Sequence, residues 1–240
     1  MCWPGIKDIG RPFFGYCSST RVSRKGKKVK EDSILERGLR ELNVSFSSKD
    51  LELIEFFLGE LSFWNRKINL VRSQGDDLIR EHILDSLSAL PVIKSLSYNK
   101  IADIGSGGGF PAIPLSIFLG ESSITLIERS GKKASFLCNV KALLRLNHVQ
   151  VTAKPLNEIT DSFDLVTLRA FGKLEDVIGE LLRITAPGGN ILVYKGRREF
   201  AEKEIEAVRD FVSDAVIVPV RVPFLNKERN LVIIKPKLLL

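Results

Sequence analysis

The stretch Asp103-Ile104-Gly105-Ser106-Gly107-Gly108-Gly109-Phe110-Pro111 decides how this chain is interpreted. It follows a short apolar run at 100–104, and the pattern predicts a glycine loop between a strand and a helix. Glycines let a backbone turn tightly and approach a ligand without side chains in the way. Because open α/β sheets bind ligands at the carboxyl ends of their strands, we expect a ligand site at this loop.

Apolar runs and longer amphipathic stretches alternate along the C-terminal part of the chain. The predicted strands lie at 100–104, 124–128, 149–153, 163–168, 190–195, 215–221 and 230–235. This alternation is typical of an α/β protein with an open parallel sheet covered on both faces. No helical stretch separates the last two runs, so we expect them to form an antiparallel hairpin at the sheet edge.

The region before the glycine loop is predicted to be helical. From Ser47 to Leu70, apolar side chains recur at helical intervals, and Ser47 and Asp50 have the spacing of a capping box. A second helix is predicted over 76–90, with acids in its first turn and Pro91 just past its end. The region contains no strand signal.

The net charge of +7 comes from one end of the chain. Residues 1–30 carry eight basic side chains and one acidic one, whereas the other 210 residues carry 28 of each sign. The composition predicts a disordered basic tail at 1–30, a helical region at 31–95 and a Rossmann-like core at 96–240. The tail is either an arm that binds RNA phosphates or an incidental extension, and the sequence leaves both interpretations open.

Cysteine and histidine usage excludes several classes of protein. Cys2, Cys17 and Cys138 include no C-x-x-C pair, which predicts neither a disulfide framework nor a zinc site. Two histidines without ligand spacing also predict no metal. The first twenty residues lack the apolar segment of a signal peptide and a membrane span. We expect a cytoplasmic protein that binds neither metal nor membrane.

The glycine spacing discriminates between nucleotide cofactors. A dinucleotide fingerprint, G-x-G-x-x-G, requires a third glycine where this chain has Phe110. The D-x-G-x-G-x-G spacing suits S-adenosylmethionine, with Asp103 placed to attract its ammonium group. Glu128 ends the second predicted strand, 23 residues after Gly105, where an acid is expected to bind ribose hydroxyls. The alternative is that Glu128 is a surface acid and the glycines form only a tight turn.

Four ordered segments resemble the bacterial 16S rRNA 7-methylguanosine methyltransferases, the glucose-inhibited division protein B family. The segments are K-I-N-L at 67–70, H-I-L-D-S-L at 82–87, the glycine loop, and V-T-L-R-A at 166–170. The resemblance covers residues 35–235 and not the basic tail. It implies a seven-stranded Rossmann-like fold and methyl transfer from S-adenosylmethionine to guanosine N7. The implied partner is 16S rRNA or the small ribosomal subunit, and we expect a monomer.

The resemblance also implies which residues bind the cofactor. Gly105 and Phe110 would line its site, and Arg169 would contact it. The family usually has R-A-E after the third strand, where this chain has Pro155-Leu156-Asn157, so only backbone contacts carry over at these positions. The expected cofactor-binding residues are Gly105, Phe110, Glu128, Arg129, Ser130, Leu156, Asn157 and Arg169.

No catalytic residue is predicted. Guanine N7 has an unprotonated lone pair at neutral pH, so methyl transfer needs positioning and electrostatic stabilisation but no general base. His82 and Asp85 share a helix face, and we favour a polar cluster that joins the helical region to the sheet over an acid–base pair. Candidates for RNA contact are Arg129, Lys132, Lys133, Lys195, Arg197 and Arg198, although Lys132 and Lys133 also fit an ordinary solvated helix face.

Two other functions stay open at this point. A nicotinamide-dependent oxidoreductase is disfavoured by Phe110 and by the absence of a Tyr-x-x-x-Lys motif. A non-catalytic nucleotide-binding module is compatible with the sequence, because N7 methylation leaves no catalytic-residue signature.

Overall fold

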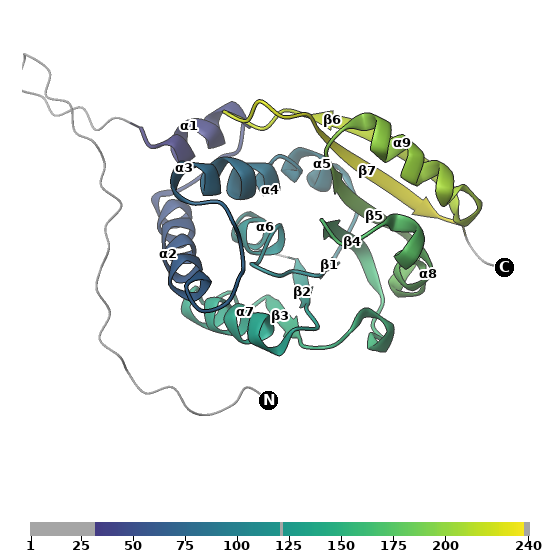
Figure 1. Cartoon of the computed structure of the whole chain (residues 1–240), viewed down its shortest axis with the longest axis horizontal. Coiled ribbons are helices and arrows are strands. Elements are labelled where there is room, and N and C mark those ends of the chain that lie inside the picture. The colour runs from purple at the N-terminus through teal and green to yellow at the C-terminus, as the bar shows by residue number, and fades with distance from the viewer. Residues whose placement is uncertain (1–31, 121, 238–240) are drawn as a thin grey trace, which may run out of the picture.

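A single mixed sheet organises residues 32–120 and 122–237, which the computed structural model describes (Figure 1). The strand order is β3-β2-β1-β4-β5-β7-β6; β7 runs antiparallel to both neighbours, and the other pairs are parallel. The strands are β1 Lys100–Ile104, β2 Ser123–Ile127, β3 Val149–Thr152, β4 Phe163–Arg169, β5 Thr185–Lys195, β6 Val212–Val220 and β7 Arg229–Pro236. The α/β fold and the C-terminal hairpin are confirmed, whereas the tail predicted at 1–30 lies outside the described residues.

Helices cover both faces of this sheet. In Figure 1, α2, α6 and α7 lie to one side of it, and α8 and α9 lie to the other. The helices are α1 Ile34–Glu41, α2 Ser48–Asn65, α3 Gly75–Leu78, α4 Asp85–Leu87, α5 Leu90–Ser95, α6 Ala112–Phe118, α7 Gly131–Leu143, α8 Leu174–Ile184 and α9 Arg198–Ala207. Within the described part of the chain, no helix has the length and apolar character needed to cross a membrane.

The N-terminal helices share one hydrophobic core with the sheet. Leu39 of α1 and Phe57 of α2 are buried in the same cluster as Ile101 of β1 and Leu192 of β5. Val193, the next residue along β5, faces a second cluster beneath α8 and α9, as the alternation of side chains along a strand requires. The helical region is therefore packed as a part of the core and not as a separate layer.

The sequence predicts that α2 continues to Leu70, but the helix ends five residues earlier, at Asn65. The capping box at its start is confirmed, because Ser47 and Asp50 each accept the other's backbone N–H. The helix stops at Asn65 because this side chain binds the backbone that follows. Its Oδ1 accepts the N–H groups of Leu70 and Val71, and its Nδ2 donates to the carbonyl of Val71 at 2.9 Å. The residues after Asn65 therefore form a loop.

The second predicted helix is interrupted, and its predicted end is wrong. Residues 76–90 comprise α3, a π-helical segment at Ile79–Leu84, and α4. The Nη2 atom of Arg169 donates to the backbone carbonyl of Glu81 at 2.9 Å. In a regular α-helix this carbonyl would accept a backbone N–H from the same helix. Pro91 does not end a helix. It lies in the first turn of α5, where a missing N–H costs no hydrogen bond.

Replacing Asn65 tests how strongly this side chain fixes the loop. We expect Asn65→Ala to lower the free energy of unfolding by about 1–3 kcal/mol, because two backbone N–H groups lose their acceptor. Asn65→Asp keeps the acceptor and loses only the donor, so its loss should be smaller. Urea unfolding followed by circular dichroism measures both values. Equal stability of Asn65→Ala and the wild type would contradict this role.

Candidate cofactor site

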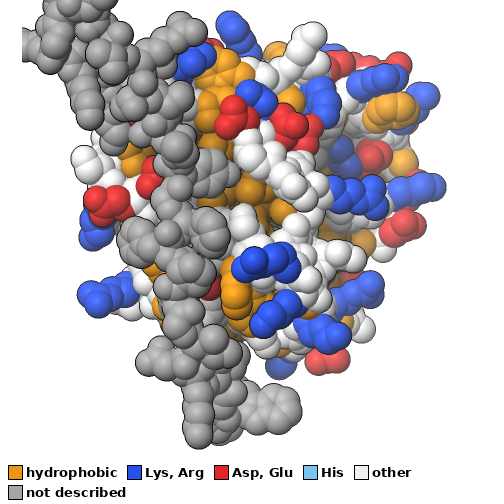
Figure 2. All heavy atoms as spheres, turned by 60° about the vertical axis from the view of Figure 1, so that its left-hand side comes forward, with side chains coloured by type: hydrophobic (Ala, Val, Ile, Leu, Met, Phe, Trp, Pro, Cys, Tyr) orange, Lys and Arg blue, Asp and Glu red, His pale blue; other side chains and the backbone are white. Residues whose placement is uncertain are grey.

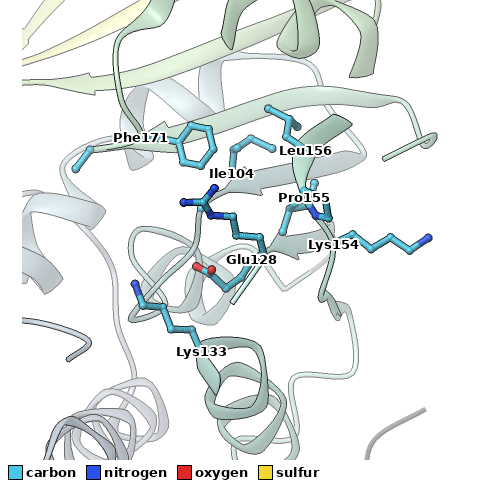
Figure 3. Close-up of a pocket in the computed structure, with 11 residues that line it drawn as sticks. Ile104, Glu128, Lys133, Lys154, Pro155, Leu156 and Phe171 are labelled. Atoms are coloured by element: carbon cyan, nitrogen blue, oxygen red, sulfur yellow. The ribbon is translucent and has the colours of Figure 1, made fainter. Parts of the chain in front are cut away.

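A pocket of about 220 Å³ lies at the carboxyl edge of the sheet (Figure 3). Its walls follow four neighbouring strands, with Gly105 after β1, Glu128 after β2, Leu156 after β3 and Phe171 after β4. The strand order reverses between β1 and β4, which is where open α/β sheets bind ligands. The pocket therefore lies where the sequence predicted a ligand site.

The glycine loop is held between the sheet and the helical region. The N–H groups of Gly105 and Ser106 both donate to the carbonyl of Ile127, at 2.9 and 3.3 Å. Gly105 has a φ of +69°, and a Cβ atom there would lie 2.3 Å from the ring of Phe171. On the other side, a Cβ atom on Gly108 would lie 3.3 Å from Val71. The positive φ and the close ring explain why Gly105 requires glycine, whereas Gly108 is only tightly packed.

Glu128 is a buried part of this site. Its side chain lies at the end of β2, and only 6% of the residue is exposed, which excludes the alternative of a surface acid. Oε2 accepts the N–H of Gly107 at 2.9 Å, and Oε1 accepts the N–H of Ser130 at 2.8 Å. Each carboxylate oxygen keeps a second lone pair for a ligand hydroxyl. The carboxylate thus links the glycine loop to the start of α7.

Asp103 leaves one buried oxygen without a donor. Its Oδ1 accepts the hydroxyl of Thr167 at 2.9 Å, but its Oδ2 has no hydrogen-bond partner among the described residues. Burial raises the pKa of Asp103 from 3.8 to about 7, although the hydrogen bond from Thr167 acts to lower it. A ligand ammonium would satisfy Oδ2 and favour the charged carboxylate, so the residues present fit the predicted cofactor.

Arg169 connects β4 to the helical region. Its Nη1 lies 3.1 Å from Oδ2 of Asp85, and its Nη2 lies 2.9 Å from Nδ1 of His82. Asp85 also pairs with Arg229 of β7 at 2.8 Å, and its side chain is 5% exposed. The expectation of a polar cluster that joins the helical region to the sheet is confirmed.

His82 is held in its neutral form. Burial, followed by the charge of Arg169, lowers the pKa of His82 to about 4. A guanidinium can only donate hydrogen bonds, so Nδ1 of His82 accepts, and the ring proton is on Nε2. No group of three His, Cys, Asp or Glu side chains in the described ranges is arranged to hold a metal ion.

Phe110 packs away from the pocket. Its ring centroid lies 5.3 Å from that of Phe57 and 4.8 Å from that of His82, and the guanidinium carbon of Arg169 lies 5.9 Å from it. Phe110 is 8% exposed. Its side chain thus fixes the end of the glycine loop against the helical region.

The eight predicted site residues fall into three groups. Four of them line the pocket: Gly105, Glu128, Arg129 and Leu156. Ser130 contributes through its backbone N–H, and Asn157 is the exposed neighbour of Leu156. Phe110 and Arg169 lie in the contact between the glycine loop and the helices. Their contact with a cofactor stays a prediction.

Several pocket residues are absent from the predicted set, among them Phe171, Lys133 and Lys154. Phe171 covers Gly105, and Lys133 and Lys154 also belong to the wall, although Lys154 points away from the other labelled side chains in Figure 3. The sequence predicted Lys133 as an RNA contact or as part of a solvated helix face, and not as a residue of the cofactor site. Both Phe171 and Lys154 come two residues after a strand, so the rule for carboxyl ends of strands would have identified them.

Three candidates for RNA contact, Lys195, Arg197 and Arg198, are paired within the protein. The Nζ atom of Lys195 lies 2.5 Å from Oε2 of Glu204, and its side chain is 17% exposed. The Nε atom of Arg198 lies 2.7 Å from Oε1 of Glu202. The structure therefore gives Lys195 a structural role, contrary to the prediction of an RNA contact.

Comparisons with known proteins show the fold and the family of this chain. In fold, the chain is similar to the N-methyltransferase NodS from Bradyrhizobium japonicum in complex with S-adenosyl-L-homocysteine, with a TM-score of 0.53, 13% identity, and coverage of 74% of this chain and 98% of that one. Ribosomal RNA small subunit methyltransferase G from Treponema pallidum (strain Nichols) is 37% identical over 213 residues, which cover 85% of this chain and 94% of the relative.

The same description applies to a relative from Borrelia garinii subsp. bavariensis, which is 31% identical over 205 residues, 84% of this chain and 98% of its own. Residues 50–232 match the profile of the GidB family, described as rRNA small subunit methyltransferase G. The matched region contains the glycine loop, Glu128, Arg169 and the strands that carry them. The chain therefore belongs to the GidB family.

Proposed function

We propose that this protein transfers a methyl group from S-adenosylmethionine to N7 of a guanosine in 16S rRNA. The observation that carries the proposal is the pocket at the switch point of a GidB-family chain, which Glu128 lines; Asp103, with a buried acceptor oxygen that has no partner among the described residues, directly precedes the glycine loop. These groups match the two polar ends of the cofactor, its ammonium and its ribose.

Each part of the cofactor has a proposed partner. Asp103 would bind the ammonium, and Glu128 would accept hydrogen bonds from the ribose hydroxyls. Backbone groups near Leu156 and Asn157 would contact the adenine, because a backbone contact does not depend on which side chain stands at that position. Gly105 lets the backbone approach the ligand. When bound, S-adenosylmethionine supplies an electrophilic methyl group.

The side chains around the site position groups and do not transfer protons. His82 is neutral at physiological pH, and its one free lone pair is used by Arg169. N7 of guanine needs no deprotonation, so a neutral, hydrogen-bonded histidine is compatible with the reaction. The protein contributes orientation and a preorganised electrostatic environment. We also propose that it acts as a monomer in the cytoplasm, where it meets small ribosomal subunits.

The primary test is methyl transfer. Purified protein with labelled S-adenosylmethionine should transfer label to small ribosomal subunits or 16S rRNA from a strain that lacks this methylation. Borohydride and aniline should cleave the product at the labelled base, as expected of 7-methylguanosine. Cofactor binding without any transfer would favour a non-catalytic binding module. Tight binding of NADH instead would contradict the proposal.

Arg169→Ala should affect both stability and cofactor binding. Removal of one partner of buried Asp85 should cost about 3 kcal/mol in the free energy of unfolding. Affinity for S-adenosylhomocysteine should fall roughly tenfold in calorimetry, as expected for the loss of a charge-assisted hydrogen bond. Arg229→Ala is the matched control, because it removes the other partner of Asp85 away from the glycine loop. Equal affinity losses in both variants would reduce Arg169 to a structural role.

The raised pKa of Asp103 predicts proton release on binding. Below pH 7 the ligand-free carboxyl is mostly protonated, and an ammonium favours its ionised form. Binding of S-adenosylhomocysteine at pH 6 should therefore release about one proton, and affinity should rise with pH up to about 7. Calorimetry in buffers of different ionisation enthalpy measures this release. The variant Asp103→Asn should bind S-adenosylhomocysteine more weakly and release no proton. If the wild type released no proton on binding, Asp103 would not be the partner of the ammonium group.

A further inference from the structure

The C-terminal turn of α2 presents an exposed aromatic ring between two cations. Phe63 is 46% exposed, with the guanidinium carbon of Arg66 at 5.3 Å from its ring centroid and the Nζ atom of Lys67 at 5.0 Å. A large apolar ring in this position contributes little to the core. An accessible aromatic face flanked by positive charge is the arrangement that stacks an unpaired base and binds the adjoining phosphates.

The cations on this surface are available to a partner. Arg66, Lys67 and Arg72 are exposed, and none of them forms an ion pair with an acid in the described ranges. Figure 2 shows the side of the molecule that carries α2, where Lys and Arg side chains lie among exposed hydrophobic ones. The positive charge is therefore not neutralised within this part of the protein.

Helix packing places this turn at the edge that carries the cofactor pocket. Asn139 of α7 donates to Glu60 at 2.8 Å, and Phe136, one turn earlier, lies 5.9 Å from the ring of Trp64. The two helices are therefore antiparallel, and the end of α2 lies beside the start of α7. Lys133, in that first turn of α7, lines the cofactor pocket.

A second cavity, of about 460 Å³, adjoins the same turn. Arg66, Ser73 and Gln74 contribute to its wall, together with Leu61 and Val71. Leu61 and Val71 are also the side chains nearest to Gly108, at 3.6 and 3.3 Å from a Cβ atom built there. Leu61 and Val71 therefore adjoin both the cavity and the glycine loop, so an RNA strand held here runs close to the cofactor site.

We propose that Phe63, with Arg66 and Lys67, is a stacking platform for an unpaired base of the rRNA strand that carries the target guanosine. The ring holds the base, and the two cations bind flanking phosphates. The inference rests on the proposed function and adds to it the surface that positions the RNA.

A second aromatic site provides a matched control. Phe200 of α9 is 52% exposed and has Arg197 and Lys203 at 6.0 Å from its ring centroid. Arg197 pairs with Glu199 at 3.6 Å, which reduces its charge toward a phosphate. Phe63→Ala and Phe200→Ala therefore remove equivalent exposed rings from surfaces of different electrostatic character.

The test uses the full chain and small ribosomal subunits from a strain that lacks the methylation. Phe63→Ala should raise KM for subunits about tenfold, the usual loss of one base stacked on an aromatic ring. Its kcat and its affinity for S-adenosylhomocysteine should stay at wild-type values. Phe63→Trp should restore KM, and Phe200→Ala should leave it unchanged. The double variant Arg66→Gln, Lys67→Gln should raise KM. It should also make the slope of log binding constant against log salt concentration shallower by roughly one to two.

A binding measurement separates failure of this inference from failure of the proposed function. Co-sedimentation of the protein with subunits, in the presence of S-adenosylhomocysteine, reports on the platform even if no methyl group is transferred. Weaker binding of Phe63→Ala than of Phe200→Ala would support the platform in either case. Wild-type KM and binding for Phe63→Ala, or equal losses in both alanine variants, would overturn it.

Discussion

The Arg169 guanidinium organises the region where helices, sheet and glycine loop meet. It is a partly buried charge at the end of β4, with its side chain 16% exposed, and it is balanced by Asp85, the Glu81 carbonyl and Nδ1 of His82. A buried cation is tolerated only when its partners are held in place, so the helix that provides them must stay docked on the sheet. The π-helical segment is the local consequence, since one of its carbonyls serves the guanidinium. Phe110 is fixed by the same contacts.

The pocket gains its shape from constraints on both sides of the glycine loop. Phe171 covers Gly105 from the side of β4, and Val71 approaches Gly108 from the loop that Asn65 holds in place. Glu128 then ties the middle of the loop to α7. The backbone that would receive the cofactor is therefore preorganised by residues from both the helical region and the core.

Local signals in the sequence predicted most of the fold, and long-range contacts account for what they missed. Strand alternation, the Ser47 capping box and the position of Glu128 all follow from neighbouring residues, and the structure agrees with them. The early end of α2 and the π-helical segment depend on Asn65 and on Arg169, whose partners could not be read from periodicity. The pairing of Lys195 with Glu204 was missed for the same reason, because charge alone does not reveal a partner on another element.

Exposed cations that form no ion pair determine how the described part of the chain meets a polyanion. Outside residues 1–30 the chain carries as many acidic as basic side chains. Among the described residues, Arg66 and Lys67 at the end of α2 and Lys132 at the start of α7 are exposed and form no ion pair. Because this part of the chain has no net charge, local groups of cations, and not an overall field, determine where a polyanion first binds.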